Sequence, residues 1–166
     1  MSGHYAEGTT VPVEKSRAEI EQILRRYGAT QLLAGWDDER DLAFLGFTAY
    51  GRQVKFLLPL PPLSDFKTRT VVVGRSYRRE QLIERTPEQQ VVARDQAVRQ
   101  RWRALALAVK AKLEAVAIGI TTFEQEFLAH IVLPDGQTVG GWLRPQLEHV
   151  YATAEMPRLL GPGGDR

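Results

Sequence analysis

The chain contains no cysteine, and it has only three histidines and four serines in 166 residues. The missing thiols exclude disulfides, thiolate zinc sites and cysteine nucleophiles. They also agree with a cytoplasmic location, where disulfides do not persist. No serine lies in a G-x-S-x-G pattern, and no glycine-rich run has the spacing of a phosphate-binding loop. We therefore expect a non-enzymatic protein with no catalytic residue, no bound metal and no cofactor.

Long hydrophobic runs are absent as well. The longest nearly apolar stretch, residues 56–63, contains three prolines, whereas a membrane helix needs about 20 apolar residues. The first ten residues are small and polar, which does not fit a signal peptide. These features predict a protein of the cytoplasm that does not insert into a membrane.

Basic and acidic residues are nearly equal in number, but they are unevenly distributed along the chain. Residues 66–113 contain twelve basic and four acidic residues, a net charge of +8, so with the whole chain at +2 the remainder is −6. A concentrated basic segment favours an anionic partner, and nucleic acid is the commonest one. Most of these cations are arginines, whose planar guanidinium suits contacts with phosphates and bases.

The pattern of apolar residues and turn residues predicts a single α+β domain over residues 14–156. A flexible arm over residues 1–13 precedes it, and a tail over residues 157–166 follows it. We expect an N-terminal helix on a three- to four-stranded antiparallel sheet, then a long central helix and two shorter C-terminal helices.

The N-terminal helix and the sheet have clear local signals. Ser16 and Glu19 have the S-x-x-E spacing of a capping box, which predicts a helix from Ser16 to Tyr27. Strands are predicted over residues 31–36, 42–49 and 53–58. The Tyr50-Gly51 dipeptide favours a tight turn between the last two strands, because glycine takes positive φ without strain. That turn would pair Phe47 with Val54 and Leu45 with Phe56.

Residues 61–87 are predicted to be an irregular, basic loop region. The sheet is expected to end at three prolines, of which Pro59 precedes this segment and Pro61 and Pro62 begin it. Within it, residues 70–73 are candidates for a fourth, edge strand. Residues 74–79 form a basic loop with one aromatic residue.

The long helix over residues 87–118 has the strongest signals. Thr86 is a suitable cap and Pro87 suits the first turn, while Gly119 suits the end. A stripe of apolar residues from Val91 to Val116 recurs at helical spacing, with cations on both of its flanks. The opposite face is rich in alanine, so we expect the helix to be contacted on two faces.

The C-terminal part is predicted to contain two short helices. Thr121 and Glu124 have capping-box spacing and predict the first one. Residues 134–136 form a strong turn signal. The last helix is expected to begin near Thr138 and to kink or restart at Pro145.

The basic segment supplies the leading functional hypothesis, which is nucleic-acid binding, with single strands favoured. Cations interleaved with an aromatic residue are typical of backbone contact combined with base stacking. Trp36 and Trp142 are further stacking candidates, although tryptophans beside apolar runs are usually core residues. The residues predicted to bind are Arg75, Tyr77, Arg78, Arg79, Arg94, Arg99, Arg101 and Arg103.

Other interpretations remain open. The arginines of the long helix can equally pair with acids elsewhere in the chain, and its alanine face and apolar stripe then suit a protein partner, either a second copy or a host factor. A weaker alternative is a metal-dependent nuclease. Its ligands would be Glu124, Glu126, His130 and Asp135. The acidic run over residues 37–41 is interpreted as a solvated turn, because it lacks the spacing of a calcium-binding loop.

Several segments resemble a group of short proteins from tailed phages and prophages to which no activity is assigned. The similar segments are residues 11–21, 26–29, 100–105, 110–116, 119–124, 126–129 and 133–136. The resemblance implies a viral or mobile-element origin, and hence the cytoplasm of a host cell. Small phage proteins often handle DNA or bind a host protein, so the resemblance does not distinguish between the two leading interpretations.

Overall fold

A computed structural model describes residue 6, residues 8–74 and residues 78–155. It confirms the α+β class, with one three-stranded and one two-stranded antiparallel sheet. In chain order the elements are α1 (Val13–Arg26), β1 (Gln31–Asp37), β2 (Leu42–Ala49), β3 (Arg52–Pro59), the 3₁₀-helix η1 (Leu63–Phe66), β4 (Thr68–Val73), β5 (Arg79–Glu84), α2 (Pro87–Ala117), α3 (Phe123–Phe127), the 3₁₀-helix η2 (Leu128–His130) and α4 (Val139–Thr153).

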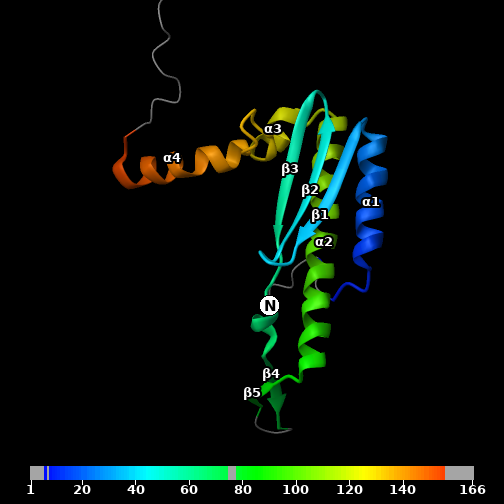
Figure 1. The fold of residues 1–166 in the computed structure, drawn as a ribbon, viewed down its shortest axis with the longest axis vertical. Coiled ribbons are helices and arrows are strands. Elements are labelled where there is room, and N and C mark those ends of the chain that lie inside the picture. The colour runs from blue at the N-terminus through cyan, green and yellow to red at the C-terminus, as the bar shows by residue number, and fades with distance from the viewer. Residues whose placement is uncertain (1–5, 7, 75–77, 156–166) are drawn as a thin grey trace, which may run out of the picture.

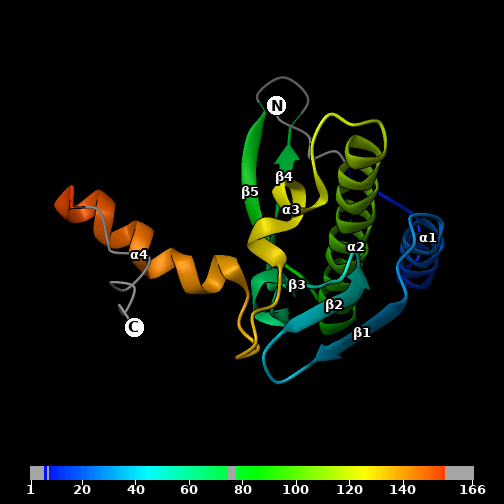
Figure 2. The same ribbon diagram turned by 90° about the horizontal axis from the view of Figure 1, so that it is seen from above.

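The elements form an elongated body with two projections (Figures 1 and 2). Strands β1–β3 form the main sheet, and α1 with the C-terminal half of α2 forms a second layer behind it. The N-terminal half of α2 extends past the sheet to the β4–β5 hairpin, while α4 projects sideways. In the described part of the chain, no helix combines the length and the hydropathy that crossing a bilayer would require.

The main sheet has the predicted order and register. Strand β2 lies between β1 and β3, and it pairs Phe47 with Val54 and Leu45 with Phe56. Tyr50 and Gly51 both have positive φ, of 52° and 71°, as a type I′ hairpin turn requires. The local turn chemistry therefore determines which side chains share each face.

The core lies between the main sheet and the two helices. Burial alternates strictly along β2, because successive side chains of a strand point to opposite faces. Phe127 of α3 is fully buried and makes edge-on contacts with Phe47 and Phe56, with ring centroids 5.8 and 6.3 Å apart. The buried core residues of these elements are Ile20, Ile23, Leu24, Ala43, Leu45, Phe47, Ala49, Val54, Phe56, Trp102, Leu105, Ala106, Val109, Leu113, Phe123 and Phe127.

The start of α1 differs from the prediction. The helix begins at Val13 after the cap Pro12, so Ser16 lies inside it rather than at its cap. Ser16 is fully buried four residues before Ile20, and its hydroxyl has no hydrogen-bond partner. Glu19 forms an ion pair with Arg103 of α2. The capping-box interpretation was wrong because Ser16 is on the face of α1 that packs into the core.

Helix α2 has the predicted bounds. Thr86 caps it through a capping box with Gln89, and Gly119 after it has a φ of 78°. The stripe is buried only in the C-terminal half; Val91, near the other end, is 48% exposed because the main sheet and α1 do not reach it. On the alanine face, Ala104, Ala108 and Ala111 are exposed, and its other residues, Ala97, Leu107 and Ala115, are half-buried. Helix α1 is the second element that contacts α2. It packs on the side of α2 that carries Arg103 and not on the alanine face.

The segment predicted to be irregular contains a regular hairpin. Strands β4 and β5 pair with each other and form a separate sheet, so residues 70–73 do not extend the main sheet. The prolines after β3 lack the N–H donor that a neighbouring strand would need. The chain therefore leaves the main sheet, and the hairpin forms beside the N-terminal half of α2.

The C-terminal helices differ from the prediction in two details. The capping box of α3 is formed by Thr122 and Gln125, one residue later than expected. Helix α4 begins after Thr138 as predicted, but it continues through Pro145 without a break. Proline removes the bond to the carbonyl of Gly141, and Gly141 is exposed, so water can satisfy that carbonyl.

Candidate nucleic-acid interface

The β4–β5 hairpin carries its charges on separate faces. Side chains directly opposite in an antiparallel pair share a face, and the face alternates along each strand. The register places Arg69, Val71 and Val73 on the same face as Arg79. The ladder continues for one more pair, since the Arg85 N–H donates to the Lys67 carbonyl.

This arrangement gives the hairpin one cationic face, formed by Lys67, Arg69, Arg79 and Arg85, which we call the basic face. The opposite face carries Glu80 and Glu84. Within the described residues, no ion pair is formed by any of the four cations. Their charge is therefore available to an anion from outside the chain.

The basic face looks toward α2 and encloses an open groove with it. The groove has a volume of about 490 Å³ and combines cations at its edges with apolar side chains from α2. We call it the hairpin groove. Its lining residues are Arg69, Arg85, Glu88, Gln89, Val92, Ala93, Gln96 and Arg99. Glu88 is the one carboxylate among the described residues of this lining.

Two of the groove arginines are held in place by neighbouring groups. Arg85 donates to the backbone carbonyls of Phe66 and Thr68. Arg99 donates to the Gln96 side chain at 2.8 and 3.2 Å. Guanidinium groups have five N–H donors, so both keep donors for a ligand while the partners fix their orientation.

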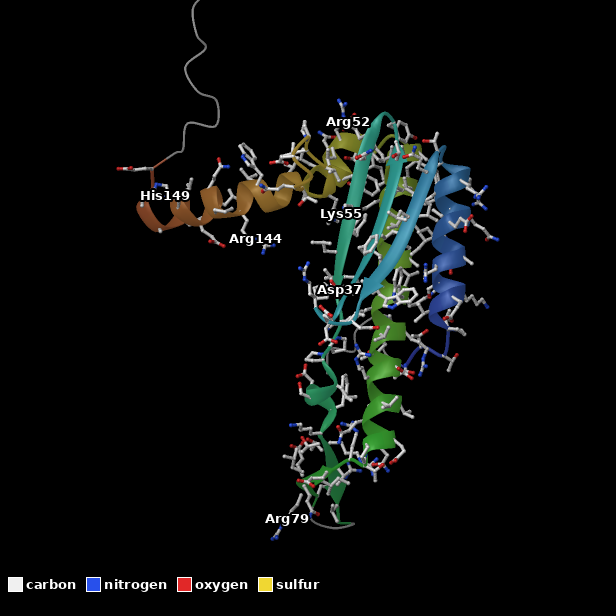
Figure 3. All side chains as sticks on the ribbon, viewed as in Figure 1. Asp37, Arg52, Lys55, Arg79, Arg144 and His149 are labelled. Atoms are coloured by element: carbon white, nitrogen blue, oxygen red, sulfur yellow. The ribbon has the colours of Figure 1, made fainter. Side chains whose placement is uncertain are left out.

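Two of the predicted binding residues lie at the far end of the hairpin. Arg78 and Arg79 are exposed, and Figure 3 shows Arg79 at the end of the molecule remote from α4. Arg75 and Tyr77, which were predicted beside them, lie outside the described residues. The predicted stacking role of Tyr77 stays a prediction.

The arginines of α2 have different surroundings. Arg94 and Arg103 form ion pairs with Asp41 and Glu19. Arg101 donates to the carbonyl of Pro59. These three side chains hold α2 against the main sheet and α1, which is the pairing that the sequence left open as an alternative. Of the four predicted arginines on α2, Arg99 is the one that lines the hairpin groove.

The sequence interpretation missed Lys67, Arg69 and Arg85 as site residues. A signal for them is present, since Lys67, Arg69, Arg79 and Arg85 are separated by even numbers of residues within each strand segment. Such a period of two places side chains on one face of a strand. The prediction of an irregular segment over residues 61–87 obscures this period.

Two of the four residues of the weaker nuclease hypothesis, Glu126 and His130, make other contacts. Lys112 lies 3.1 Å from the Glu126 carboxylate, and the His130 ring stacks on Phe56 at 4.0 Å. Burial and the nearby positive charge of Lys112 lower the pKa of His130 below its ordinary value. Among the described residues, no three acidic or histidine side chains are grouped closely enough to hold a metal ion.

The acidic turn over residues 38–41 also has a structural role. Asp37 accepts hydrogen bonds from the N–H groups of Glu39 and Arg40, both at 3.1 Å. Asp41 has positive φ and pairs with Arg94. Residues 38–41 form a turn as predicted, but Asp41 is half-buried in its ion pair rather than solvated.

Two further features lie outside the interface. Ser64 and Lys67 have S-x-x-K spacing around η1, but both side chains are exposed, whereas a lysine that acts as a base is usually buried. Trp36 and Trp142 are 64% and 41% exposed, so neither is a core residue. They belong to β1 and α4 rather than to the hairpin, so they do not extend the basic face.

Comparison with known proteins adds no relative: no protein family, curated protein or solved structure matches this chain. The resemblance to phage proteins therefore stays a prediction, and the function is argued from the chain itself.

Proposed function

We propose that this protein binds nucleic acid without catalysing a reaction, through the basic face of the β4–β5 hairpin and the hairpin groove beside it. The observation that carries the proposal is the convergence of Lys67, Arg69, Arg79 and Arg85 on one face, none of them in an ion pair within the described residues. Four unneutralised cations on one short ribbon favour a polyanion, which releases counterions when it binds.

A single strand fits this surface better than a duplex. The basic face is bounded by α2 along one side, so the cations at its centre are reached through the groove. A single strand can bend into such a groove, and its bases can lie against the apolar side chains of Val92 and Ala93. A duplex keeps its phosphates on a stiff outer surface, so it reaches only the cations at the edge of the hairpin.

The binding residues differ from those predicted at first. Arg94, Arg101 and Arg103 leave the proposed interface because they hold the fold together. The described part of the interface consists of Lys67, Arg69, Arg79, Arg85 and Arg99, and Arg78 adjoins it just before β5. Arginine can contact phosphate through two N–H groups at once, and it can stack on bases.

Fluorescence anisotropy with single-stranded and duplex oligonucleotides of equal length tests the proposal. The Arg69→Ala/Arg79→Ala variant is expected to lose most of the binding. The matched control is Arg52→Ala/Arg144→Ala, which removes the same charge from exposed residues of the main sheet and α4 (Figure 3). Equal losses in both variants would mean that net charge, and not this surface, determines binding.

A second candidate function is a protein-interaction module that uses the long helix. Val91 and Val92 are exposed side by side near the N-terminus of α2, the latter at 64%. A protein partner that covers them would bind with little dependence on salt, because burial of apolar surface does not release counterions. If the protein does not bind oligonucleotides at low salt, affinity capture with Val91→Asp as the control becomes the relevant experiment.

A further inference from the structure

Helix α4 stands away from the rest of the molecule. It projects sideways in both views (Figures 1 and 2), and none of its fifteen residues is buried. At 100° per residue, its apolar side chains form one stripe, while Arg144, Glu148 and Ala152 lie on the other side. The stripe consists of Val139, Trp142, Leu143, Leu147 and Val150. A helix this short gains little stability alone, because helices in proteins depend on packing of an apolar face.

Within the described residues, a second apolar surface without a covering element lies on the outer face of the main sheet. The register places Leu33 and Lys55 on either side of Gly46, and Leu57 beside Phe44. Leu33 is 66% exposed. Gly46 has no side chain, so the surface is hollowed there into a groove of about 500 Å³, which we call the sheet groove. It extends to Val132 and Gly136, close to the start of α4.

The helix and the sheet groove match in length. A helix of fifteen residues is about 22 Å long, and strands of eight residues are about 26 Å long. A stable interface usually buries about 1,600 Å² in total, and two reciprocal contacts of this length bury twice the area of one.

The helix is held in a direction that keeps it off its own sheet. A Cβ at Gly140 would lie 2.8 Å from the carbonyl oxygen of Ala129, so the first turn of α4 is packed directly on η2. The Val139 N–H also donates to the Ile131 carbonyl at 2.9 Å. Folding α4 back onto its own sheet would break both contacts, whereas a second copy can receive the helix with both contacts intact.

The charges favour the same occupant. Among the described residues that line the sheet groove, Lys55 is the one that carries a charge. Glu155 lies just beyond the C-terminus of α4, and the last turn of the helix has no basic residue. The negative end of the helix dipole is therefore uncompensated and attracts a cation such as Lys55.

We propose that the protein forms a two-fold symmetric dimer in which α4 of each copy lies in the sheet groove of the other. The exchange covers both apolar surfaces at once, as an isologous interface requires. It leaves the β4–β5 hairpins outside the interface, so it is independent of the proposed nucleic-acid binding.

Sedimentation velocity of the full chain over a concentration series tests this proposal. The wild type is expected to dimerise, and Leu143→Asp is expected to weaken dimerisation on the order of a hundredfold, because an unpaired carboxylate is excluded from an apolar groove. Ala152→Asp, which adds the same charge on the opposite side of α4, is the matched control and should dimerise like the wild type. A wild type that stays monomeric, or equal effects of the two variants, would overturn the proposal.

Cross-linking provides a test that does not depend on weakening the interface. Because the chain has no cysteine, pairs of introduced cysteines report a single contact. Leu143→Cys combined with Leu33→Cys or Leu57→Cys is expected to give a covalent dimer on mild oxidation, since disulfides need Cα atoms within about 7 Å. Ala152→Cys combined with the same sheet positions should stay monomeric. The proposal fails if the two sets cross-link to the same extent, or if neither of them cross-links.

Discussion

The guanidinium of Arg94 lies 2.9 Å from the carboxylate of Asp41 and also donates to the Pro61 carbonyl at 3.1 Å. Asp41 is in the turn between β1 and β2, where it has a φ of 46°. This pair of contacts joins the main sheet and the segment after it to α2. Arg94 therefore acts as a structural tether, although its sequence context suggested a residue that binds nucleic acid.

Removal of that tether should affect stability more than binding. Arg94→Ala is expected to lower the free energy of unfolding by about 1–2 kcal/mol, because it leaves a half-buried carboxylate and a carbonyl without their partner. Urea unfolding measures this change. Arg79→Ala is the control and should change stability by less than about 0.5 kcal/mol, since Arg79 is exposed. If Arg94→Ala lowers oligonucleotide affinity and leaves stability unchanged, its assignment as a tether is wrong.

At Ser16 we expect that truncation of the side chain does not lower stability, unlike at Arg94. Its hydroxyl is fully buried without a partner, so Ser16→Ala is expected to leave the free energy of unfolding unchanged or to raise it by about 1 kcal/mol. A helix cap at this position would instead lose about 1 kcal/mol on the same substitution. Thr86→Ala at the observed cap of α2 should show that loss. Thermal unfolding of the two variants distinguishes the accounts by the sign of the change.

Phe127 should be among the most sensitive core positions. It is fully buried at the meeting point of α3 and the main sheet, and it stacks on Phe123 with centroids 4.6 Å apart. Phe127→Ala is expected to cost about 3–5 kcal/mol through lost burial and the cavity that remains. Leu128→Ala, at the exposed neighbouring position, should cost far less. Comparable losses at the two positions would contradict the packing described for α3.

His130 should make stability depend on pH. Burial, and after it the charge of Lys112, lowers the pKa of His130 from its ordinary value of 6.5, so the folded state favours the neutral ring. The unfolded state therefore binds more protons below about pH 6.5, and stability falls as the pH decreases through that range. His130→Phe keeps an aromatic ring on Phe56 and should remove this part of the dependence.

Urea unfolding of the wild type and His130→Phe at several values between pH 5 and pH 8 measures the effect. The difference in unfolding free energy between the two proteins should change with pH, which cancels the contribution of groups that both share. Parallel curves would mean that the ring is as easily protonated in the folded state as in the unfolded one.

The sequence predicted the elements whose signals are local. The spacing of the two strand segments around Tyr50-Gly51 favoured a tight turn, and it predicted the register that the main sheet has. Thr86, Pro87 and Gly119 mark both ends of α2. The β4–β5 hairpin was missed because both faces of a two-stranded ribbon are partly exposed, so its strands lack the apolar alternation of a sheet with a core.

The candidate site was harder to derive than the fold. The sequence separates Arg94 from Asp41 by 53 residues and Arg103 from Glu19 by 84. No local pattern shows that Arg94 and Arg103 are paired, whereas Arg99 on the same helix lines the hairpin groove. The charge of the segment could be counted from the sequence, but which cations remain unpaired depends on tertiary contacts.

The salt dependence of oligonucleotide binding tests the central claim most directly. For a single strand, the slope of log K against log salt is about −0.7 for each phosphate that is neutralised. We predict that Arg69→Ala/Arg79→Ala reduces the magnitude of the wild-type slope by about 1.4, while Arg52→Ala/Arg144→Ala leaves it unchanged. An unchanged slope in the hairpin variant, or a wild type that binds no oligonucleotide at low salt, would contradict the account.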